Sequence, residues 1–251
     1  MSGLTLSFRG RPGTVLSLSG ILPERLVGQS VEAIAGIPLT SDAGTLPLGE
    51  LFALEGTPSG DGLLIRPNGA LLDRVGAGMT SGMIEVEGDV GALAGAQMAG
   101  GTLRIRGNAG DRLGGVLPGE TKGMRGGLIL LSGDAGDRVG ERMRRGTIVV
   151  NGRAGADCGA FMTAGTIAIG GACGARPGFG MRRGSLILGT ELAAAPVGFV
   201  DAGARDWVFL HLLKAYLAET GGWVGERAIG RSRRYMGDLA EQGQGEILVL
   251  P

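Results

Sequence analysis

The sequence is poor in several residue types, and each shortage excludes a class of protein. Basic and acidic residues number 24 each, so the chain lacks the basic excess of a nucleic-acid-binding protein. The two cysteines, Cys158 and Cys173, form no disulfide or zinc motif and are expected to be buried small apolar residues. No apolar run reaches the length of a membrane span, and the first residues lack the apolar core of a secretory signal. We therefore expect a cytoplasmic protein without a membrane partner.

Glycine, in contrast, is abundant and recurs in a fixed register. Its 52 copies do not indicate a flexible linker, because 43% of the residues are hydrophobic and can form a core. If the glycine before each alternating apolar run is taken as an anchor, successive anchors lie 19 residues apart, except for one step of 26. The anchors are Gly82, Gly101, Gly127, Gly146, Gly165 and Gly184. Such a period indicates a repeat architecture.

Each repeat also holds a methionine and a strand-like segment at fixed places. The methionine lies three residues before the anchor, and apolar residues occupy the second and fourth places after it. The methionines are Met79, Met98, Met124, Met143, Met162 and Met181. Alternation with a period of two predicts a β-strand with one buried face. The residues between them change from polar at Glu85 and Arg104 to apolar at Val149 and Ile187, so we expect a packing partner on the outer face of the later repeats.

The repeat predicts the fold class and three regions. Nineteen residues are too few for a propeller blade, and no helical periodicity accompanies the strand. We therefore predict an all-β fold in which residues 71–190 form a right-handed parallel β-helix (solenoid) with glycine at its sharp turns. Residues 1–70 are expected to form an irregular β region that pairs with the first repeat and caps it.

The third region, residues 191–251, is expected to contain a helix and a tail. An amphipathic helix is predicted over residues 204–220, ending at Gly221 and Gly222, and a last strand over 246–250. An open end of stacked strands exposes unpaired backbone groups, so we expect this helix to cap the end, with partner docking as the alternative.

Candidate catalytic residues are scarce. The single histidine, His211, has no partner residue in the sequence, which favours a buried or half-buried structural histidine over a general base. Asp73, Asp111 and Asp137 share one turn position, each followed by arginine, and turn capping with Asp–Arg pairing explains them better than acid catalysis. We expect no catalytic residue, no metal and no covalently bound cofactor in this chain.

Arginine is the charged residue that recurs in columns. One column at a turn consists of Arg74, Arg112, Arg138 and Arg176. A second basic group precedes the strand anchors, beside the insertion 115–121 (GVLPGET), and consists of Lys122, Arg125, Arg144, Arg145, Arg182 and Arg183. Residues at equal repeat positions stack, so these rows are candidates to bind a polyanionic ligand or an acidic partner. The alternative is a solvated surface offset by Asp111, Asp137 and Glu141.

The pattern G-x-x-h-G-x-x-M-x-x-G-x-h-x-h-x-G, where h is apolar, resembles two known glycine-repeat proteins. One is the C-terminal domain of the glutamate synthase large subunit, and the other is the C-type subunit of formylmethanofuran dehydrogenases. The resemblance covers about residues 71–190. It looks closest to the C-type subunit of the formyltransferase/hydrolase complex of methylotrophic bacteria, a chain of this length with a helix after the repeat and a tail like residues 226–231 (ERAIGR).

The resemblance implies a non-catalytic scaffold in a four-subunit complex of one-carbon metabolism. Its partners would be an amidohydrolase-like hydrolase subunit, a formyltransferase subunit and a B-type subunit. Such a complex moves a formyl group between tetrahydromethanopterin and a methanofuran-type cofactor and releases formate during formaldehyde oxidation. Methanofuran-type cofactors carry an acidic glutamate tail, which the second basic group is a candidate to contact.

Other interpretations of the same repeat stay open. The chain could be the C-type subunit of a molybdenum- or tungsten-dependent formylmethanofuran dehydrogenase, although its arginine-rich, lysine-poor composition favours the hydrolytic complex. It could also be a free-standing glutamate synthase domain that works beside glutaminase and flavin-binding chains. An independent pectin-cleaving enzyme is disfavoured, because the repeat shows no cluster of catalytic carboxylates.

Overall fold

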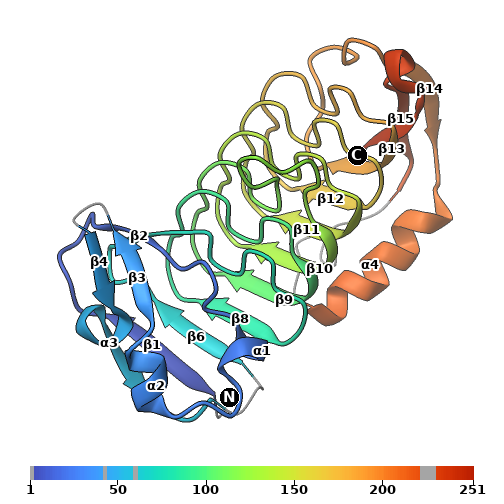
Figure 1. Cartoon of the computed structure of the whole chain (residues 1–251). Coiled ribbons are helices and arrows are strands. Elements are labelled where there is room, and N and C mark those ends of the chain that lie inside the picture. The colour runs from blue at the N-terminus through green and yellow to red at the C-terminus, as the bar shows by residue number, and fades with distance from the viewer. Residues whose placement is uncertain (1–2, 42–43, 59–61, 221–229) are drawn as a thin grey trace.

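The structure, a computed structural model, describes residues 3–41, 44–58, 62–220 and 230–251. It is elongated and mostly β, with few helices (Figure 1). A twelve-stranded sheet runs along its length, and a four-stranded sheet lies at the N-terminal end. The coarse prediction of a β protein built on a long parallel sheet is confirmed.

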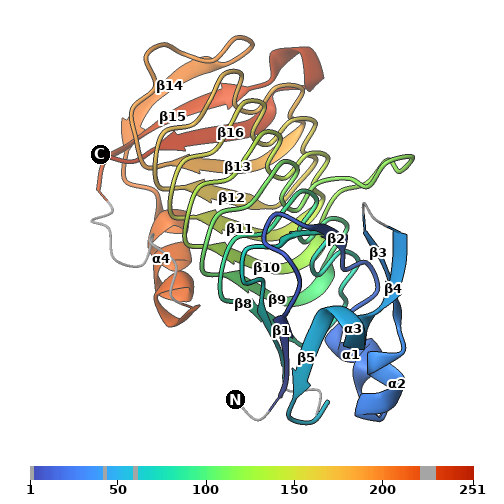
Figure 2. The same ribbon diagram turned by 90° about the vertical axis from the view of Figure 1, so that its left-hand side faces the viewer.

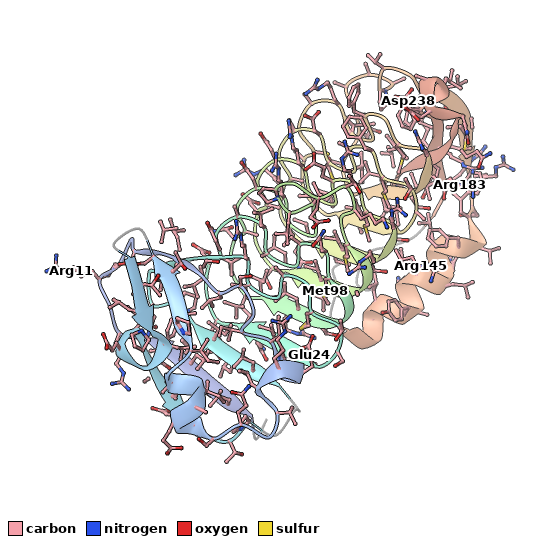
Figure 3. All side chains as sticks on the ribbon, viewed as in Figure 1. Arg11, Glu24, Met98, Arg145, Arg183 and Asp238 are labelled. Carbon is pink, nitrogen blue, oxygen red and sulfur yellow. The ribbon has the colours of Figure 1, made fainter. Side chains whose placement is uncertain are left out.

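The N-terminal region joins the large sheet through its own strands. Strand β1 pairs in parallel with β6, which in turn pairs in parallel with the first strand of the repeats, so the expected pairing is confirmed. The carboxylate of Glu24, labelled in Figure 3, accepts hydrogen bonds from the backbone nitrogen (2.7 Å) and hydroxyl (3.0 Å) of Thr80. The elements here are β1 (Leu4–Phe8), β2 (Val15–Ser17), α1 (Pro23–Leu26), α2 (Val31–Ala35), β3 (Pro38–Ser41), β4 (Gly44–Pro47), α3 (Leu48–Leu51), β5 (Phe52–Glu55), β6 (Leu63–Arg66) and β7 (Leu71–Asp73).

The repeats contribute six strands that pair in parallel with their neighbours along the sheet. They are β8 (Met83–Val86), β9 (Ala99–Ile105), β10 (Arg125–Leu131), β11 (Arg145–Val150), β12 (Thr166–Ile169) and β13 (Arg183–Leu188). Residues at equal repeat positions lie opposite one another, as Ile148, Ile167 and Leu186 do. A second parallel ladder of single bridges includes Ala135 with Ala154 and Ala154 with Cys173. The predicted register of the repeat is therefore confirmed on two faces.

The interior between these faces is apolar and closed to solvent. All six repeat methionines have no exposed surface, and Figure 3 labels one of them, Met98, inside the molecule. The inward residues of the strands, such as Ile84 and Leu103, are equally buried. Burying an apolar side chain of this size stabilises a fold by about 1.5–3 kcal/mol, so this recurring row contributes a large share of the hydrophobic stabilisation.

Glycine does not hold every sharp turn of the repeat. At one turn position the backbone is left-handed, with φ between 55° and 63°, and glycine is absent. The residues there are Arg74, Leu93, Arg112, Arg138, Asp157 and Arg176. Other glycines are needed for close approach, since a Cβ on Gly155 would lie 2.1 Å from Oδ1 of Asp137. The prediction that glycine alone makes the turns is therefore wrong for this position.

The C-terminal region extends the large sheet with three strands. Its elements are β14 (Val200–Arg205), α4 (Val208–Thr220), β15 (Ser232–Gly237), the 3-10 helix η2 (Leu239–Glu241) and β16 (Gln244–Val249). Strand β16 pairs in parallel with β13, and β15 and β14 follow in antiparallel order. The helix begins later than expected because Ala204 and Arg205 belong to β14. The predicted helix end at Gly221 and Gly222 lies outside the described residues.

Helix α4 packs on the side of the sheet and does not cap its end. Leu210, Leu213 and Leu217 are buried against the outer-face residues Val149 and Ile187 (Figures 1 and 2). The expectation of a packing partner on the outer face of the later repeats is confirmed. The prediction that the helix caps the end of the repeats is therefore wrong. The helix covers the apolar outer face of the sheet, and the free edge of β13 pairs with β16 instead.

Candidate functional site

The three repeated aspartates are structural. The backbone nitrogen of Ala92 donates to Oδ1 of Asp73 at 2.7 Å, and that of Ala156 donates to Oδ1 of Asp137 at 2.8 Å. Oδ1 of Asp111 likewise accepts from the backbone nitrogen of Asp137 at 2.8 Å. Each carboxylate thus caps a backbone N–H of the next repeat, and the turn-capping interpretation is confirmed.

The turn column of arginines is largely neutralised by carboxylates. Arg112 Nε and Arg138 Nη1 lie 3.3 and 3.6 Å from the two carboxylate oxygens of Glu141. Arg176 Nη2 lies 2.7 Å from Oδ2 of Asp157. Among the described residues, no ion pair joins an arginine to Asp73, Asp111 or Asp137, so the Asp–Arg ladder expected at these aspartates does not form. This column matches the alternative of a solvated, charge-compensated surface better than an anion site.

Two of the six predicted site residues share one depression in the surface. Arg144 and Arg182 line a hollow of about 150 Å³ on the turn side of the repeats. We call it the arginine hollow; its lining includes Thr121, Arg142, Arg144, Phe161, Thr163 and Arg182. Thr121 is the last residue of the insertion, so the insertion reaches the site.

The arginine hollow has an excess of positive charge. Three guanidinium groups line it, and the one carboxylate among its described lining residues, Glu241, accepts from Arg182 Nε at 2.7 Å. The guanidinium carbon of Arg142 lies 5.1 Å from the ring centroid of Phe161. Arg144 makes no side-chain hydrogen bond or ion pair with any residue that the structure describes. The arrangement can bind a carboxylate or phosphate, and its described lining offers no histidine or cysteine for acid–base or nucleophilic chemistry.

The other four predicted residues lie elsewhere on the surface. Arg125, Arg145 and Arg183 are the first residues of β10, β11 and β13 and are exposed (Figure 3 labels the last two). Arg183 Nε donates to Oε1 of Gln244 at 2.7 Å. Lys122 is exposed and is not among the residues that line the hollow. The six residues therefore do not converge on one site.

Sequence reasoning missed several members of the hollow, among them Arg142 and Phe161. Both stand directly before a repeat methionine, 19 residues apart, and both have left-handed backbones with φ of 56° and 55°. Residues at equal repeat positions lie side by side, so the stacking of this arginine on this ring was already present in the repeat register.

The single histidine lies in a different environment from the one expected. His211 lies on an exposed face of α4, so the expectation of a buried or half-buried histidine is wrong. Within the described ranges, no group of three or more histidine, cysteine and carboxylate side chains is arranged to hold a metal ion. Among the helices of those ranges, none has the length and hydrophobicity needed to cross a membrane.

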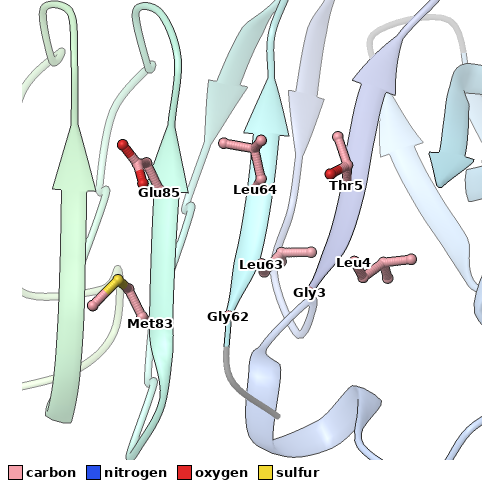
Figure 4. A pocket seen from close by; sticks show the side chains of 8 residues that line it. All are labelled: Gly3, Leu4, Thr5, Gly62, Leu63, Leu64, Met83 and Glu85. Carbon is pink, nitrogen blue, oxygen red and sulfur yellow. The ribbon is translucent and has the colours of Figure 1, made fainter. Parts of the chain in front are cut away.

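A second small pocket lies between β1, β6 and β8 and is shown in Figure 4. Its volume is about 40 Å³, and it is lined by residues that include Thr5, Leu64 and Met83. Its one carboxylate, Glu85, is paired with Arg106. The pocket has room for little more than a water molecule, and its acid is engaged, so it is not a catalytic site.

The repeat and its fold define the class of protein. A model of the GXGXG motif family matches residues 49–194, more than half of the chain, and the chain belongs to this family. It is a homologue of the C-type subunit of the Fhc complex. It is 40% identical over 89 residues to the C-type subunit of the formyltransferase/hydrolase complex Fhc of Methylorubrum extorquens, an alignment that spans 35% of this chain and 32% of that protein.

A solved structure extends this similarity to nearly the whole chain. One chain in the X-ray crystal structure of the formyltransferase/hydrolase complex (FhcABCD) from Methylorubrum extorquens in complex with methylofuran is 37% identical. The match has a TM-score of 0.83 and covers 98% of this chain and 99% of the other. The similarity therefore includes the N-terminal region and the strands after the repeats.

Proposed function

We propose that this chain is the C-type subunit of a cytoplasmic formyltransferase/hydrolase complex and acts in it as a non-catalytic scaffold. The observation that carries the proposal is the similarity over 98% of the chain, at 37% identity, to a chain of the solved Methylorubrum extorquens complex. Matching at both ends supports a role for the whole chain and argues against the interpretation as a detached glutamate synthase domain.

The reaction of the complex is assigned to its other subunits. An amidohydrolase-like subunit, a formyltransferase subunit and a B-type subunit would complete it, and together they would move a formyl group between tetrahydromethanopterin and a methanofuran-type cofactor and release formate. The scaffold role is supported by the composition of the arginine hollow, which has charge but no acid–base or nucleophilic pair.

The fold we propose for the repeat region is a right-handed parallel β-helix. Two parallel ladders support it, each of which pairs residues 19 apart in sequence: one runs through the strands, and the other runs through the bridges at Ala135, Ala154 and Cys173. A parallel connection between neighbouring strands is right-handed in nearly all proteins. We propose regions 1–70, 71–190 and 191–251 as its N-terminal cap, repeat body and C-terminal part. Residues 226–229 of the tail that resembles the family lie outside the described residues.

We propose that the arginine hollow contacts the acidic glutamate tail of a methanofuran-type cofactor. Three arginines facing one paired carboxylate leave a positive excess that suits a chain of carboxylates. Guanidinium groups also bind carboxylates through two parallel hydrogen bonds, and Arg144, whose side chain has no partner in the described part of the chain, is free to make them. The remaining members of the predicted set, Lys122, Arg125, Arg145 and Arg183, are proposed as contacts to a neighbouring acidic subunit.

The test is affinity purification of the tagged chain from its own cells, with mass spectrometry of the proteins that accompany it. The proposal predicts an amidohydrolase-like subunit and a formyltransferase subunit in equal amounts with the tagged chain. If the chain is recovered with molybdopterin-containing or tungsten-containing dehydrogenase subunits, or with glutaminase and flavin-binding chains, it belongs to another complex and the proposal is wrong. An unrelated tagged protein from the same cells serves as the control for nonspecific capture.

A further inference from the structure

The two cysteines lie together on adjacent repeats. Cys173 is bridged in register to Ala154, and Cys158 follows Ala154 by four residues on the same repeat. Both are free thiols, and Cys173 packs against the buried apolar core to which Cys158 belongs. The two side chains lie close enough for each thiol to shift the pKa of the other. The sequence spacing of 15 residues gave no sign of this contact, because it arises from the 19-residue stacking of one repeat on the next.

The environments of the two thiols differ. Cys158 has no exposed surface, whereas Cys173 is partly exposed, which corrects the expectation that both are buried. Cys173 lines an open groove of about 540 Å³, which we call the cysteine groove. Its other lining residues include Arg176, Pro177, Phe179, Pro196 and Val197. A small reagent can therefore reach one thiol directly and the other only through its neighbour.

The contact also shifts the pKa values of the two thiols in opposite directions. The hydrogen bond from Cys158 lowers the pKa of Cys173, although burial opposes the shift. The same hydrogen bond and burial raise the pKa of Cys158. Arg176 lines the groove as well, with its guanidinium paired to Asp157 at 2.7 Å. A thiol that is reachable, more acidic and next to a second thiol has the features of a reactive cysteine with a resolving partner.

We propose that Cys158 and Cys173 form a redox-active dithiol that peroxides convert to a disulfide. The thiolate of Cys173 attacks a peroxide oxygen, an S–O bond forms as the O–O bond breaks, and hydroxide leaves when the oxidant is hydrogen peroxide. The sulfur of Cys158 then attacks the sulfenic sulfur, the S–S bond forms, and the S–O bond breaks. The thiol proton leaves with the hydroxyl group as water. The two thiols lose two electrons, and one peroxide is reduced to two water molecules.

This inference does not depend on the proposed function, and its test uses the isolated full-length chain. The reduced protein is treated with hydrogen peroxide, denatured, alkylated with iodoacetamide and weighed by intact-mass spectrometry. We expect the loss of two hydrogen atoms, the loss of both alkylation sites, and recovery of both after treatment with dithiothreitol. A peptide with a low-pKa thiol is the control that shows the peroxide dose is sufficient. If both thiols of the protein can still be alkylated at that dose, the proposal is overturned. A disulfide that links two chains on a non-reducing gel would also overturn it.

Two variants separate the roles of the thiols. In Cys158→Ala, Cys173 should stop at the sulfenic acid and become labelled by dimedone, a sulfenic-acid reagent. In Cys173→Ser, the buried Cys158 should resist peroxide, and no dimedone adduct should form. Equal dimedone labelling of both variants would contradict the assigned order of attack. The mass measurement uses only the wild-type chain, so the test of disulfide formation does not depend on whether the two variants fold.

Discussion

Gly146 shows why the anchor position of the repeat requires glycine. Its φ is +98°, a conformation that residues with a side chain rarely adopt. A Cβ there would lie 2.7 Å from the carbonyl oxygen of Gly127 on the preceding repeat and 2.8 Å from Cε of the buried Met124. Both neighbours belong to the packed repeat body and have little room to move. Conformation and contact therefore act together at this residue.

We expect Gly146→Val to lower the free energy of unfolding by about 3 kcal/mol or more, because it adds a steric clash to backbone strain. The matched control is Gly119→Val in the insertion, where φ is +83° and nothing lies within 4 Å of a Cβ. That variant should lose only the cost of the left-handed conformation, about 1–3 kcal/mol. Thermal and denaturant unfolding of both chains measure the difference. Equal losses would show that contact between repeats adds nothing at Gly146.

The basic residues show how far sequence reasoning reaches at the scale of single residues. The repeat predicted that the basic residues form columns and that residues at equal repeat positions stack on one another. The repeat did not predict which basic residues share the arginine hollow. A register irregularity between Arg125 and Leu128 sets Arg125 opposite Arg145, whereas its equivalent in the repeat is Arg144. Local bulges of this kind have no signal in a glycine-spaced period.

For the arginine hollow we expect the double variant Arg144→Gln, Arg182→Gln to bind a polyglutamate peptide about tenfold more weakly for each arginine removed. One charge-assisted hydrogen bond contributes about 1.5–3 kcal/mol, and the affinity should also fall with added salt. Arg145→Gln with Arg183→Gln is the control, since it removes the same charge outside the hollow. Calorimetric titration of the isolated full-length chain measures the affinities, so that the proposed subunit contacts of Arg145 and Arg183 play no part. Equal weakening by the two pairs would reduce the hollow to general surface charge.

At the scale of elements, α4 shows a prediction that was right about the helix and wrong about its place. The spacing of the apolar residues in 204–220 indicated an amphipathic helix, and the apolar outer positions of the later repeats indicated a partner on that face. Taken together, the predicted helix and the predicted apolar outer face indicate that the helix packs on the sheet. The sheet is instead extended at this end by β14, β15 and β16. Of these, β16 pairs with β13, and that long-range pairing leaves little trace in the local sequence.

The packing of α4 predicts a contrast between two leucines of the same helix. Leu210 is fully buried against the sheet, whereas Leu212 is 66% exposed. Leu210→Ala should lower the free energy of unfolding by about 2–4 kcal/mol, because it leaves a cavity between helix and sheet. Leu212→Ala should change it by less than about 0.5 kcal/mol. Denaturant unfolding of the isolated chain distinguishes them, and a neutral Leu210→Ala would mean that α4 does not pack on the sheet in solution.

At the scale of the whole molecule, the strands of the repeats form one continuous sheet with β1, β5 and β6 of the N-terminal region and β14, β15 and β16 of the C-terminal region. Such a long, regular body has extended faces and one shallow basic hollow, and its described residues show no metal cluster. The sequence predicted the stacked parallel strands of the repeats, because a period of 19 residues leaves few alternatives, but it did not predict the strands that extend the sheet after them. It could not show how partners are arranged around the body, since that depends on surfaces of other chains.

The central claim is that this chain holds the complex together while other subunits perform the reaction. The most direct measurement is reconstitution of the complex from separately purified subunits, with and without this chain, followed by native mass spectrometry and an assay of formate release. We expect one four-subunit particle that contains this chain, a marked loss of assembly and activity without it, and no activity of the chain alone. A fully assembled and active complex in its absence, or formate release by the chain alone, would contradict the account.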